Sequence, residues 1–340
     1  MMIHVWNTCH HCGQAPIRGP RYHCETCRLG PESDLCAACY AGYSRGRVSH
    51  PAGDDPFRTA RHHFVVVAGA SADRHLSWLE PSVPRVEPPK VNAGCLVRPE
   101  FFHRNASSFG AYACIVQVGP RILALTALHV LDEVARKNGL DTTVENTTYT
   151  GEELPRVITQ VNLYDALQEK WAFHCLGTAG PMLVLPNARS NVEEPLGYRD
   201  IAAFVVREDA NVRELRLAAA APEIGEPVWL AARFAGDARL RAAVVVDKTE
   251  LSFVFRFADR LRGPKYTSGA PILNVDGEVA GINVGAGCLQ EQPLGHAIHA
   301  ESIHAHLRDA SAWQASCNER WVEARAPLAA VLPFSRRDDT

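Results

Sequence analysis

The spacing of cysteines near the amino terminus constrains the fold of this chain more than any other feature. Six cysteines form three Cys-x2-Cys pairs: Cys9 and Cys12, Cys24 and Cys27, and Cys36 and Cys39. His50 and the adjacent His62 and His63 follow them. Zinc takes four tetrahedral thiolate or imidazole ligands, and one Cys-x2-Cys turn supplies two of them. Six cysteines and two histidines would fill two closed sites, so we expect two structural zinc ions here rather than disulfide bonds.

The residues between these cysteines resemble a ZZ-type zinc finger over about residues 4 to 68. The resemblance rests on His4-x4-Cys9, on the segment 16–24 and on Ser33-Asp-Leu-Cys36. It implies interleaved sites, with one zinc ion on Cys9, Cys12, Cys36 and Cys39. The second ion would take Cys24, Cys27, His50 and His62, with His63 as the alternative to His62. Residues 51–61 separate the two histidines by more than the family usually allows, so another group could replace His50.

ZZ fingers are binding modules, and the resemblance implies a protein or peptide as the ligand. Several fingers of this type bind peptide amino termini through carboxylates near the first cysteine and in the Asp-Leu-Cys segment. Only Asp34 fits that pattern here, because His10 stands where such fingers have an acid. Amine recognition is therefore a weaker expectation than binding of some protein or peptide.

Three segments further along the chain contain the residues of a nucleophilic triad. They are 124–130 (Ala-Leu-Thr-Ala-Leu-His-Val), 199–206 (Arg-Asp-Ile-Ala-Ala-Phe-Val-Val) and 266–272 (Tyr-Thr-Ser-Gly-Ala-Pro-Ile). A serine hydroxyl becomes a good nucleophile when a histidine takes its proton and a carboxylate orients that histidine. The chain order His129, Asp200, Ser268 is the order of the chymotrypsin arrangement. These segments resemble the trypsin-like serine proteases, and 267–285 with 294–307 resembles their HtrA-type branch.

The resemblance implies a fold and a role for each of these residues. We expect a mainly β chain in which a small cross-brace zinc finger precedes a chymotrypsin-like domain of two six-stranded β-barrels and a carboxy-terminal helix. His129 would act as general base and acid, Asp200 would orient it, and Ser268 would be the nucleophile. Among the other acids between the histidine and the serine (Asp132, Asp165, Asp237 and Asp247), Asp165 is the second choice for the orienting carboxylate.

The chain departs from the family pattern two residues before the serine. The family has glycine there, and that amide, with the serine's own, donates to the tetrahedral oxyanion. Here the residue is Tyr266, which adopts glycine's backbone angles only with strain. Six residues before the serine stands Arg262, where the family places the floor of its primary specificity pocket. It would pair with an acidic substrate side chain, or it is a solvated loop residue.

Short apolar segments separated by turn residues predict an all-β domain. The predicted strands are 112–118, 122–127, 157–164, 171–176, 182–185, 201–206, 228–234, 242–247 and 251–257. The proline-rich run 80–90 predicts an extended spacer. The expected divisions are 1–70 for the finger, 71–93 for the linker, 94–315 for the protease domain and 316–340 for a tail. Residues 300–310 are the predicted closing helix, and the four histidines between 296 and 306 are expected on the surface.

Composition excludes several classes of partner. The net charge of −3 and the absence of a basic stripe argue against nucleic acid. The apolar runs fall far below the roughly 20 residues of a membrane helix, and the amino terminus lacks the pattern of an export signal. Five further cysteines, an odd number, suit free thiols in a reducing compartment, so we expect a cytoplasmic protein.

Three functions follow from these features. The first is a serine endopeptidase that acts on protein or peptide substrates, with Ser268 and Tyr266 as oxyanion donors and with the finger binding the substrate or a partner. The second is a binding or scaffold protein whose protease domain is degenerate or latent. The third, hydrolysis by zinc, is disfavoured because two closed four-ligand sites leave no position for water. We therefore expect no cofactor for catalysis.

Overall fold

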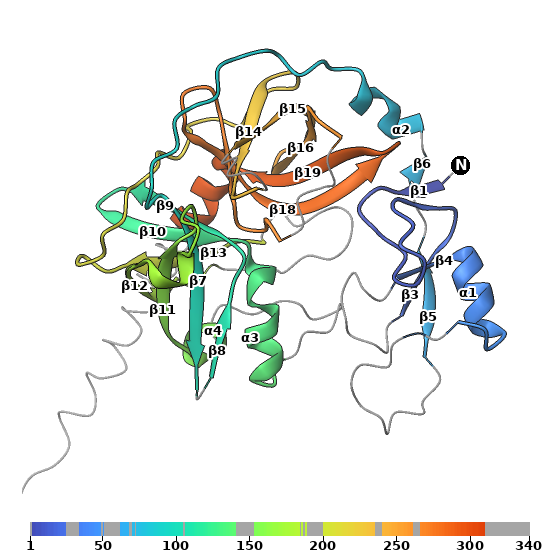
Figure 1. Ribbon diagram of the computed structural model, residues 1–340, viewed down its shortest axis with the longest axis horizontal. Coiled ribbons are helices and arrows are strands. Elements are labelled where there is room, and N and C mark those ends of the chain that lie inside the picture. Colours follow the sequence, from blue (N-terminus) through green and yellow to red (C-terminus); the bar gives the residue numbers. More distant parts are fainter. Residues whose placement is uncertain are drawn as a thin grey trace, which may run out of the picture.

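The computed structural model describes residues 2–24, 34–48, 50, 62–67, 70–71, 73–104, 106–140, 153–183, 185, 188, 200–234, 240–260 and 266–309. Strands dominate it, and they form two closed barrels beside a small amino-terminal module (Figure 1). The predicted mainly β class with two six-stranded barrels is confirmed. In the described part of the chain, no helix is long and apolar enough to cross a bilayer.

The amino-terminal module consists of two three-stranded sheets and one helix. The sheet β2-β1-β6 contains Ile17–Arg18, Met2–His4 and Ala70–Ser71, and the sheet β4-β3-β5 contains Asp34–Cys36, Arg21–Cys24 and Phe64–Val67. Helix α1 (Ala37–Ser44) follows β4 directly. A module of this size buries little apolar surface. Its buried cluster of Cys9, Ile17, Leu35, Cys36 and Cys39 therefore depends on cysteines as well as on hydrophobic side chains.

The first barrel is built from strands β7 to β13. Their order is β11-β12-β13-β10-β9-β7, and pairing of β11 with β7 closes the barrel, while β8 extends β7 as a hairpin. In the described residues, four short helices lie between these strands. The elements are β7 (Leu96–His103), β8 (Ala106–Phe109), β9 (Ala113–Val118), β10 (Arg121–Thr126), η3 (Leu128–Leu131), α3 (Asp132–Lys137), α4 (Glu153–Val157), β11 (Ile158–Asp165), η4 (Trp171–Phe173), β12 (Cys175–Met182) and β13 (Ala202–Val206).

The second barrel closes in the order β14-β15-β16-β19-β18-β17. Its interior contains three aromatic rings from one strand: Phe253, Phe255 and Phe257. Glycine is required opposite them, since a Cβ at Gly295 would lie 2.1 Å from a ring carbon of Phe255. The elements are β14 (Pro227–Ala231), β15 (Leu240–Lys248), β16 (Ser252–Phe257), β17 (Pro271–Leu273), β18 (Val279–Leu289) and β19 (Gln292–His299), and residues 300–309 form the expected carboxy-terminal helix.

The amino-terminal module packs against the second barrel. Ile3, Val5 and Trp78 share one buried cluster with barrel residues from β15, β16, β18 and β19. The backbone amide of Cys288 donates to the carbonyl of Val5 at 2.9 Å, which fixes the module to β18. Figure 1 shows the module beside the hairpin of β18 and β19. The amino-terminal module is therefore packed onto the second barrel rather than separate from it.

The first part of the predicted linker is folded rather than extended. Helix α2 (Asp73–Leu76) and the turn η2 (Ser77–Leu79) lie there, and Trp78 is buried. The indole Nε1 of Trp78 donates to Asp247 at 3.1 Å, and Arg256 Nε donates to the Trp78 carbonyl at 3.0 Å. Residues 82–93 run without regular secondary structure apart from a turn. The domain boundaries stay predictions.

The expectation that the histidines from 296 to 306 lie on the surface is wrong for three of them. His296, His299 and His306 are buried. His296 packs against Trp6 with ring centroids 5.8 Å apart, and His299 bonds the Glu250 carbonyl and the Ser302 amide. Trp6 of the docked finger covers His296, and His299 is bonded to the start of the final helix.

Candidate active site and metal centres

Strand pairing in the first barrel brings His129 beside Asp200. Strands β10 and β13 pair antiparallel with Thr126 opposite Ala202. His129 lies three residues after that pair, in η3, and Asp200 lies two residues before it. The two residues therefore project from the same end of the sheet. Ser268 reaches them from the second barrel, in the turn that precedes β17.

The three side chains form a continuous hydrogen-bonded series. His129 Nδ1 lies 2.6 Å from Asp200 Oδ2, and His129 Nε2 lies 2.7 Å from Ser268 Oγ. The backbone amide of His129 donates to the other carboxylate oxygen of Asp200 at 2.8 Å. Asp200 is fully buried, whereas a quarter of the His129 side chain is exposed. The carboxylate is thus fixed, and the imidazole and hydroxyl are open to a substrate.

The charge environment strongly favours the protonated form of His129. Burial alone would lower its pKa, but the charge and hydrogen bond of Asp200, helped by Asp132, outweigh burial and raise the pKa to about 9. Below that pH, Nε2 carries a proton and donates to the serine. Above it, Nε2 is an acceptor for the serine proton, which is the state that a general base needs.

The turn that carries Ser268 is held by both barrels. The Tyr112 amide donates to the Ser268 carbonyl at 3.1 Å, and the Gly269 amide donates to the Asn283 carbonyl at 2.8 Å. The Asn283 side chain also donates to the Thr267 carbonyl and hydroxyl, at 3.2 and 3.1 Å. Gly269 has a φ of +82°, and a Cβ there would lie 2.0 Å from the Tyr112 carbonyl oxygen. Only glycine fits this turn.

Tyr266 adopts the left-handed backbone conformation, which glycine reaches without strain and tyrosine does not. Its φ is +64°, and its side chain is 83% exposed. Within the described part of the chain, neither the Tyr266 amide nor the Ser268 amide donates a hydrogen bond.

The other candidate acids have separate roles or lie outside the described residues. Asp165 is buried at the end of β11, where its carboxylate accepts from the Leu167 amide and Gln168 Nε2. Asp247 accepts from Trp78, as described above. Asp237 and Arg262 fall outside the described residues. Asp200 is therefore the carboxylate that the structure places on His129.

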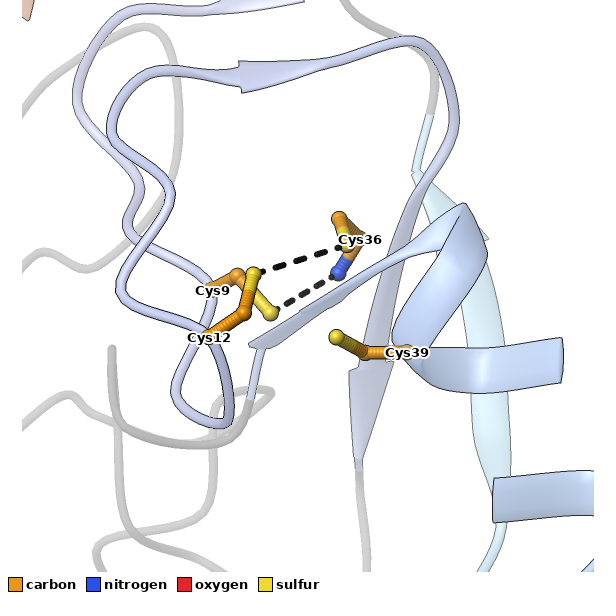
Figure 2. A group of neighbouring side chains, drawn as sticks. All are labelled: Cys9, Cys12, Cys36 and Cys39. Carbon is orange, nitrogen blue, oxygen red and sulfur yellow. Dashed lines mark hydrogen bonds between the residues drawn. The ribbon is translucent and has the colours of Figure 1, made fainter. Parts of the chain in front are cut away.

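One cluster of four cysteines matches the first expected zinc site. The sulfurs of Cys9, Cys12, Cys36 and Cys39 lie within 4.8 Å of one another. Figure 2 shows the four side chains grouped together. Cys12 Sγ lies 3.9 Å from Cys36 Sγ. Four thiolates around a tetrahedral zinc ion, each at about 2.3 Å, would be separated by about 3.8 Å. The loop after β1, the end of β4 and the first turn of α1 thus present a donor set that fits zinc.

A second cluster brings Cys24, His50 and His62 together, with their donor atoms within 4.8 Å. Cys24 Sγ lies 3.4 Å from His62 Nδ1. Both ring nitrogens of His50 are buried without a hydrogen-bond partner among the described residues. Burial, and then the neighbouring His62, lower the pKa of His50 to about 4, so its imidazole is neutral, as a metal ligand must be. These features fit zinc.

The structure distinguishes between His62 and His63 as the candidate ligand of this second site. His62 belongs to the cluster, whereas the His63 side chain is exposed. Despite the long intervening segment, His50 reaches the cluster. Cys27, the expected fourth ligand, lies outside the described residues.

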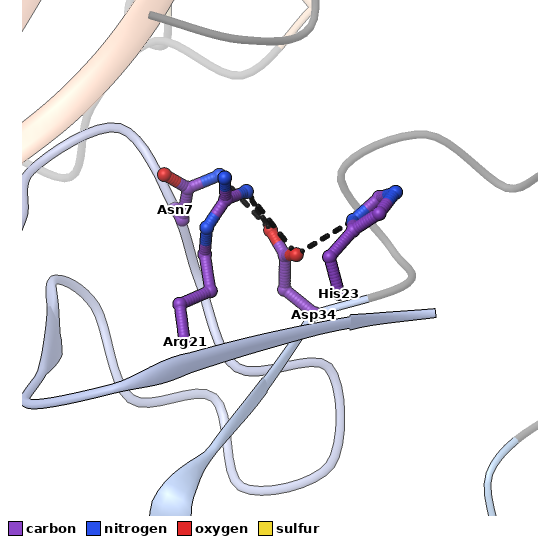
Figure 3. Close-up of polar contacts among 4 residues, drawn as sticks. All are labelled: Asn7, Arg21, His23 and Asp34. Atoms are coloured by element: carbon purple, nitrogen blue, oxygen red, sulfur yellow. Dashed lines mark hydrogen bonds and ion pairs between the residues drawn. The ribbon is translucent and has the colours of Figure 1, made fainter. Parts of the chain in front are cut away.

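Asp34 occupies a position that sequence reasoning did not foresee. Its carboxylate is fully buried and accepts hydrogen bonds from Asn7, Arg21 and His23 at 2.9 to 3.2 Å, as Figure 3 shows. The Arg21 guanidinium forms an ion pair with it. Asp34 therefore links the loop before Cys9 to β3 and β4, and its oxygens are already engaged. This arrangement argues against the expected use of Asp34 to bind a peptide amine.

Comparison with known proteins agrees with this reading of the amino-terminal module. Residues 3–47 match the family model "Zinc finger, ZZ type". The amino-terminal module is similar to ZZ-type zinc fingers. A comparison with curated proteins finds no match.

Solved structures of proteases are similar to the chain at low identity. The active form of the Rv3671c protease from M. tuberculosis is 14% identical with a TM-score of 0.41, over 68% of this chain and 90% of that one. The MamO protease domain from Magnetospirillum magneticum, in its apo form, is 17% identical with a TM-score of 0.37, over 63% of this chain and 95% of that one.

Proposed function

We propose that this protein is a serine endopeptidase that cleaves protein or peptide substrates. The observation that carries the proposal is the series Asp200, His129, Ser268, with separations of 2.6 and 2.7 Å between the bonded atoms. A buried carboxylate on Nδ1 and a serine hydroxyl on Nε2 are the two contacts that convert serine into a nucleophile. Ser268 and His129 are both partly exposed, so a substrate can reach the hydroxyl and the imidazole.

The reaction would follow from these contacts. Ser268 Oγ attacks the scissile carbonyl carbon while its proton passes to His129 Nε2. The carbonyl oxygen becomes an oxyanion that accepts from the amides of Ser268 and Tyr266. The C–N bond then breaks, and His129 returns its proton to the leaving amine. Water attacks the acyl-serine by the same route, which releases the acid and restores the hydroxyl.

We further propose that the finger holds two structural zinc ions and binds a protein or peptide that is a substrate or partner. The first ion would bind Cys9, Cys12, Cys36 and Cys39, and the second would bind Cys24, Cys27, His50 and His62. Bound zinc supplies fold stability here rather than chemistry, because closed sites leave no position for a substrate. The buried, fully engaged Asp34 favours recognition by other groups of the finger.

Labelling with a fluorophosphonate probe tests the proposed activity. We expect covalent labelling of the zinc-loaded protein and none in Ser268→Ala. Asp200→Asn should reduce the turnover of a peptide substrate by about 10⁴-fold. Asp165→Asn is the matched control, since it also removes a buried carboxylate of the first barrel, and it should leave labelling intact. An unlabelled wild type would contradict the proposal.

A latent protease with a working finger is the second candidate. The observation that favours it is the left-handed backbone conformation of Tyr266, two residues before the serine. Tyrosine is strained in this conformation, whereas glycine is not. For this candidate, labelling would be absent from the isolated protein and would appear when a partner of the finger is added. If the probe labels the protein neither alone nor with the partner, a scaffold function remains.

A further inference from the structure

We propose that the side chain of Tyr266 is a specificity determinant that packs against an apolar substrate side chain next to the scissile bond. This inference rests on the proposed peptidase function. It assigns a role to a side chain that is largely exposed.

The conformation of Tyr266 is unfavourable, and contacts of its side chain with the described residues do not offset it. A non-glycine residue held in the left-handed region is strained when its surroundings impose that conformation. The φ of +64° lies in that region. The side chain is 83% exposed, and within the described residues it forms neither a ring contact nor a hydrogen bond. Glycine would be the better residue here for stability alone.

The position of Tyr266 is fixed relative to the nucleophile. Thr267 is buried and held by Asn283, and Ser268 is held by Tyr112. The Cα atoms of Tyr266 and Ser268 are separated by no more than about 7.6 Å, two steps of the chain. A peptide whose scissile carbonyl lies on Ser268 Oγ therefore brings its nearest side chains within reach of the Tyr266 ring.

The chemistry of the ring indicates what it would contact. Tyrosine presents a large apolar face at a low entropic cost and is enriched in protein interfaces for that reason. An exposed ring beside a nucleophile gains most by covering an apolar or aromatic side chain of the substrate. We expect aliphatic or aromatic residues next to the cleaved bond to be favoured over glycine.

The test compares cleavage patterns rather than total activity. Wild type and Tyr266→Ala, which keeps the amide and a Cβ, are incubated with a peptide library, and the products are identified by mass spectrometry. The best substrate is then paired with a peptide in which the apolar residue next to the cleaved bond is replaced by glycine. The ratio of kcat/KM for the two peptides cancels any effect of the variant on the nucleophile itself.

We expect the ratio to fall about tenfold in Tyr266→Ala and to be kept in Tyr266→Phe, since aromatic packing rather than the hydroxyl is required. Phe173→Ala is the matched control, because Phe173 is also 83% exposed and lies in η4, apart from the triad. That variant should keep the wild-type ratio. An unchanged ratio in Tyr266→Ala would overturn the inference while leaving the peptidase function in place. A wild type that the fluorophosphonate does not label would overturn both.

Discussion

At the scale of single residues, the electrostatics of His129 determine when the site can work. A base must be neutral, and the pKa of His129 is raised to about 9. We therefore predict that kcat/KM of the free enzyme rises about tenfold per pH unit below pH 9 and levels off above it. Steady-state cleavage of a peptide whose own charge is constant between pH 6 and 10 measures this profile. A plateau already reached at pH 7 would contradict it.

The interaction of His129 with Asp200 should also make the stability of the folded state depend on pH. The pKa of His129 lies above its ordinary value of 6.5, so its protonation stabilises the folded state fully below pH 6.5. This contribution is lost as the pH rises through about 9. Asp200→Asn removes the partner, so its melting temperature should fall below that of wild type at pH 6, and by less at pH 10. Equal differences at both pH values would contradict the linkage.

Gly269 offers a third prediction at this scale. Gly269→Ala places a Cβ 2.0 Å from the Tyr112 carbonyl oxygen and 2.3 Å from Thr126 Oγ1, in a backbone with φ of +82°. We expect a loss of more than about 2 kcal/mol of stability and loss of fluorophosphonate labelling. Gly225→Ala is the control, because Gly225 also has a positive φ but has no atom within 4 Å of such a Cβ. Denaturant melts should show the smaller loss there.

The sequence predicted that His129, Asp200 and Ser268 act together, and the structure places the three side chains in contact, whereas the partners of Asp34 were not predicted. Each triad residue stands in a recognisable local segment, so its neighbours along the chain identify it. The contacts of Asp34 depend on the register of β3 with β4, which places His23 opposite Asp34 and Arg21 opposite Cys36. Side chains on one face of a strand pair become neighbours only through that register, and no local pattern specifies it.

At the scale of elements, apolar segments predicted most of the strands that surround the site. The segments at 122–127 and 201–206 correspond to β10, which ends shortly before His129, and β13, which begins shortly after Asp200. The predicted strand at 171–176 is wrong in its first half, which forms the turn η4. Strand β7 was not predicted, because it contains polar residues such as Glu100 and His103 that are buried through hydrogen bonds to Ser107 and Ser108.

Strand β18 connects the finger to the turn that contains Ser268. Near its middle, Asn283 holds Thr267 and Gly269, and near its end Gly287 lies under Trp6. A Cβ at Gly287 would meet the Trp6 ring at 2.5 Å and the Val5 carbonyl oxygen at 2.6 Å. The docking of the finger therefore requires glycine at this position.

We predict that Gly287→Ala separates the finger from the barrel. The melting temperature should fall, and the fluorescence of Trp6 should shift toward that of an exposed indole. Gly285→Ala on the same strand is the control, since a Cβ there meets only His296 at an ordinary 3.5 Å. Identical melting curves for the two variants would show that the clash is relieved without undocking.

At the scale of the whole molecule, the finger and the second barrel share one buried cluster. Ile3, Val5 and Trp78 pack with Leu289 and Leu294 of the barrel, and Trp6 packs beside them on Trp78 and His296. Each large apolar side chain buried in this way contributes about 1.5 to 3 kcal/mol. The folding of the finger, and thus its metal, should influence the stability of the barrel.

Removal of zinc should therefore lower the melting temperature of the entire chain. We expect a decrease of about 5 °C or more on chelation, and recovery when zinc is added back. Trp6→Ala should reproduce the decrease while the protein keeps the zinc content of wild type, as measured by mass spectrometry of metals. A barrel transition that is the same with and without zinc would contradict the coupling.

The backbone hydrogen bond from Cys288 to Val5 has a consequence for how the finger and the triad would cooperate. A recognition module on a flexible tether presents its ligand to an active site over a range of distances. Here the module is fixed to the wall of the barrel, so the span between its surface and Ser268 is constant. A chain held by the finger would be cut at a set number of residues from the bound segment, and the protein would measure length as well as sequence.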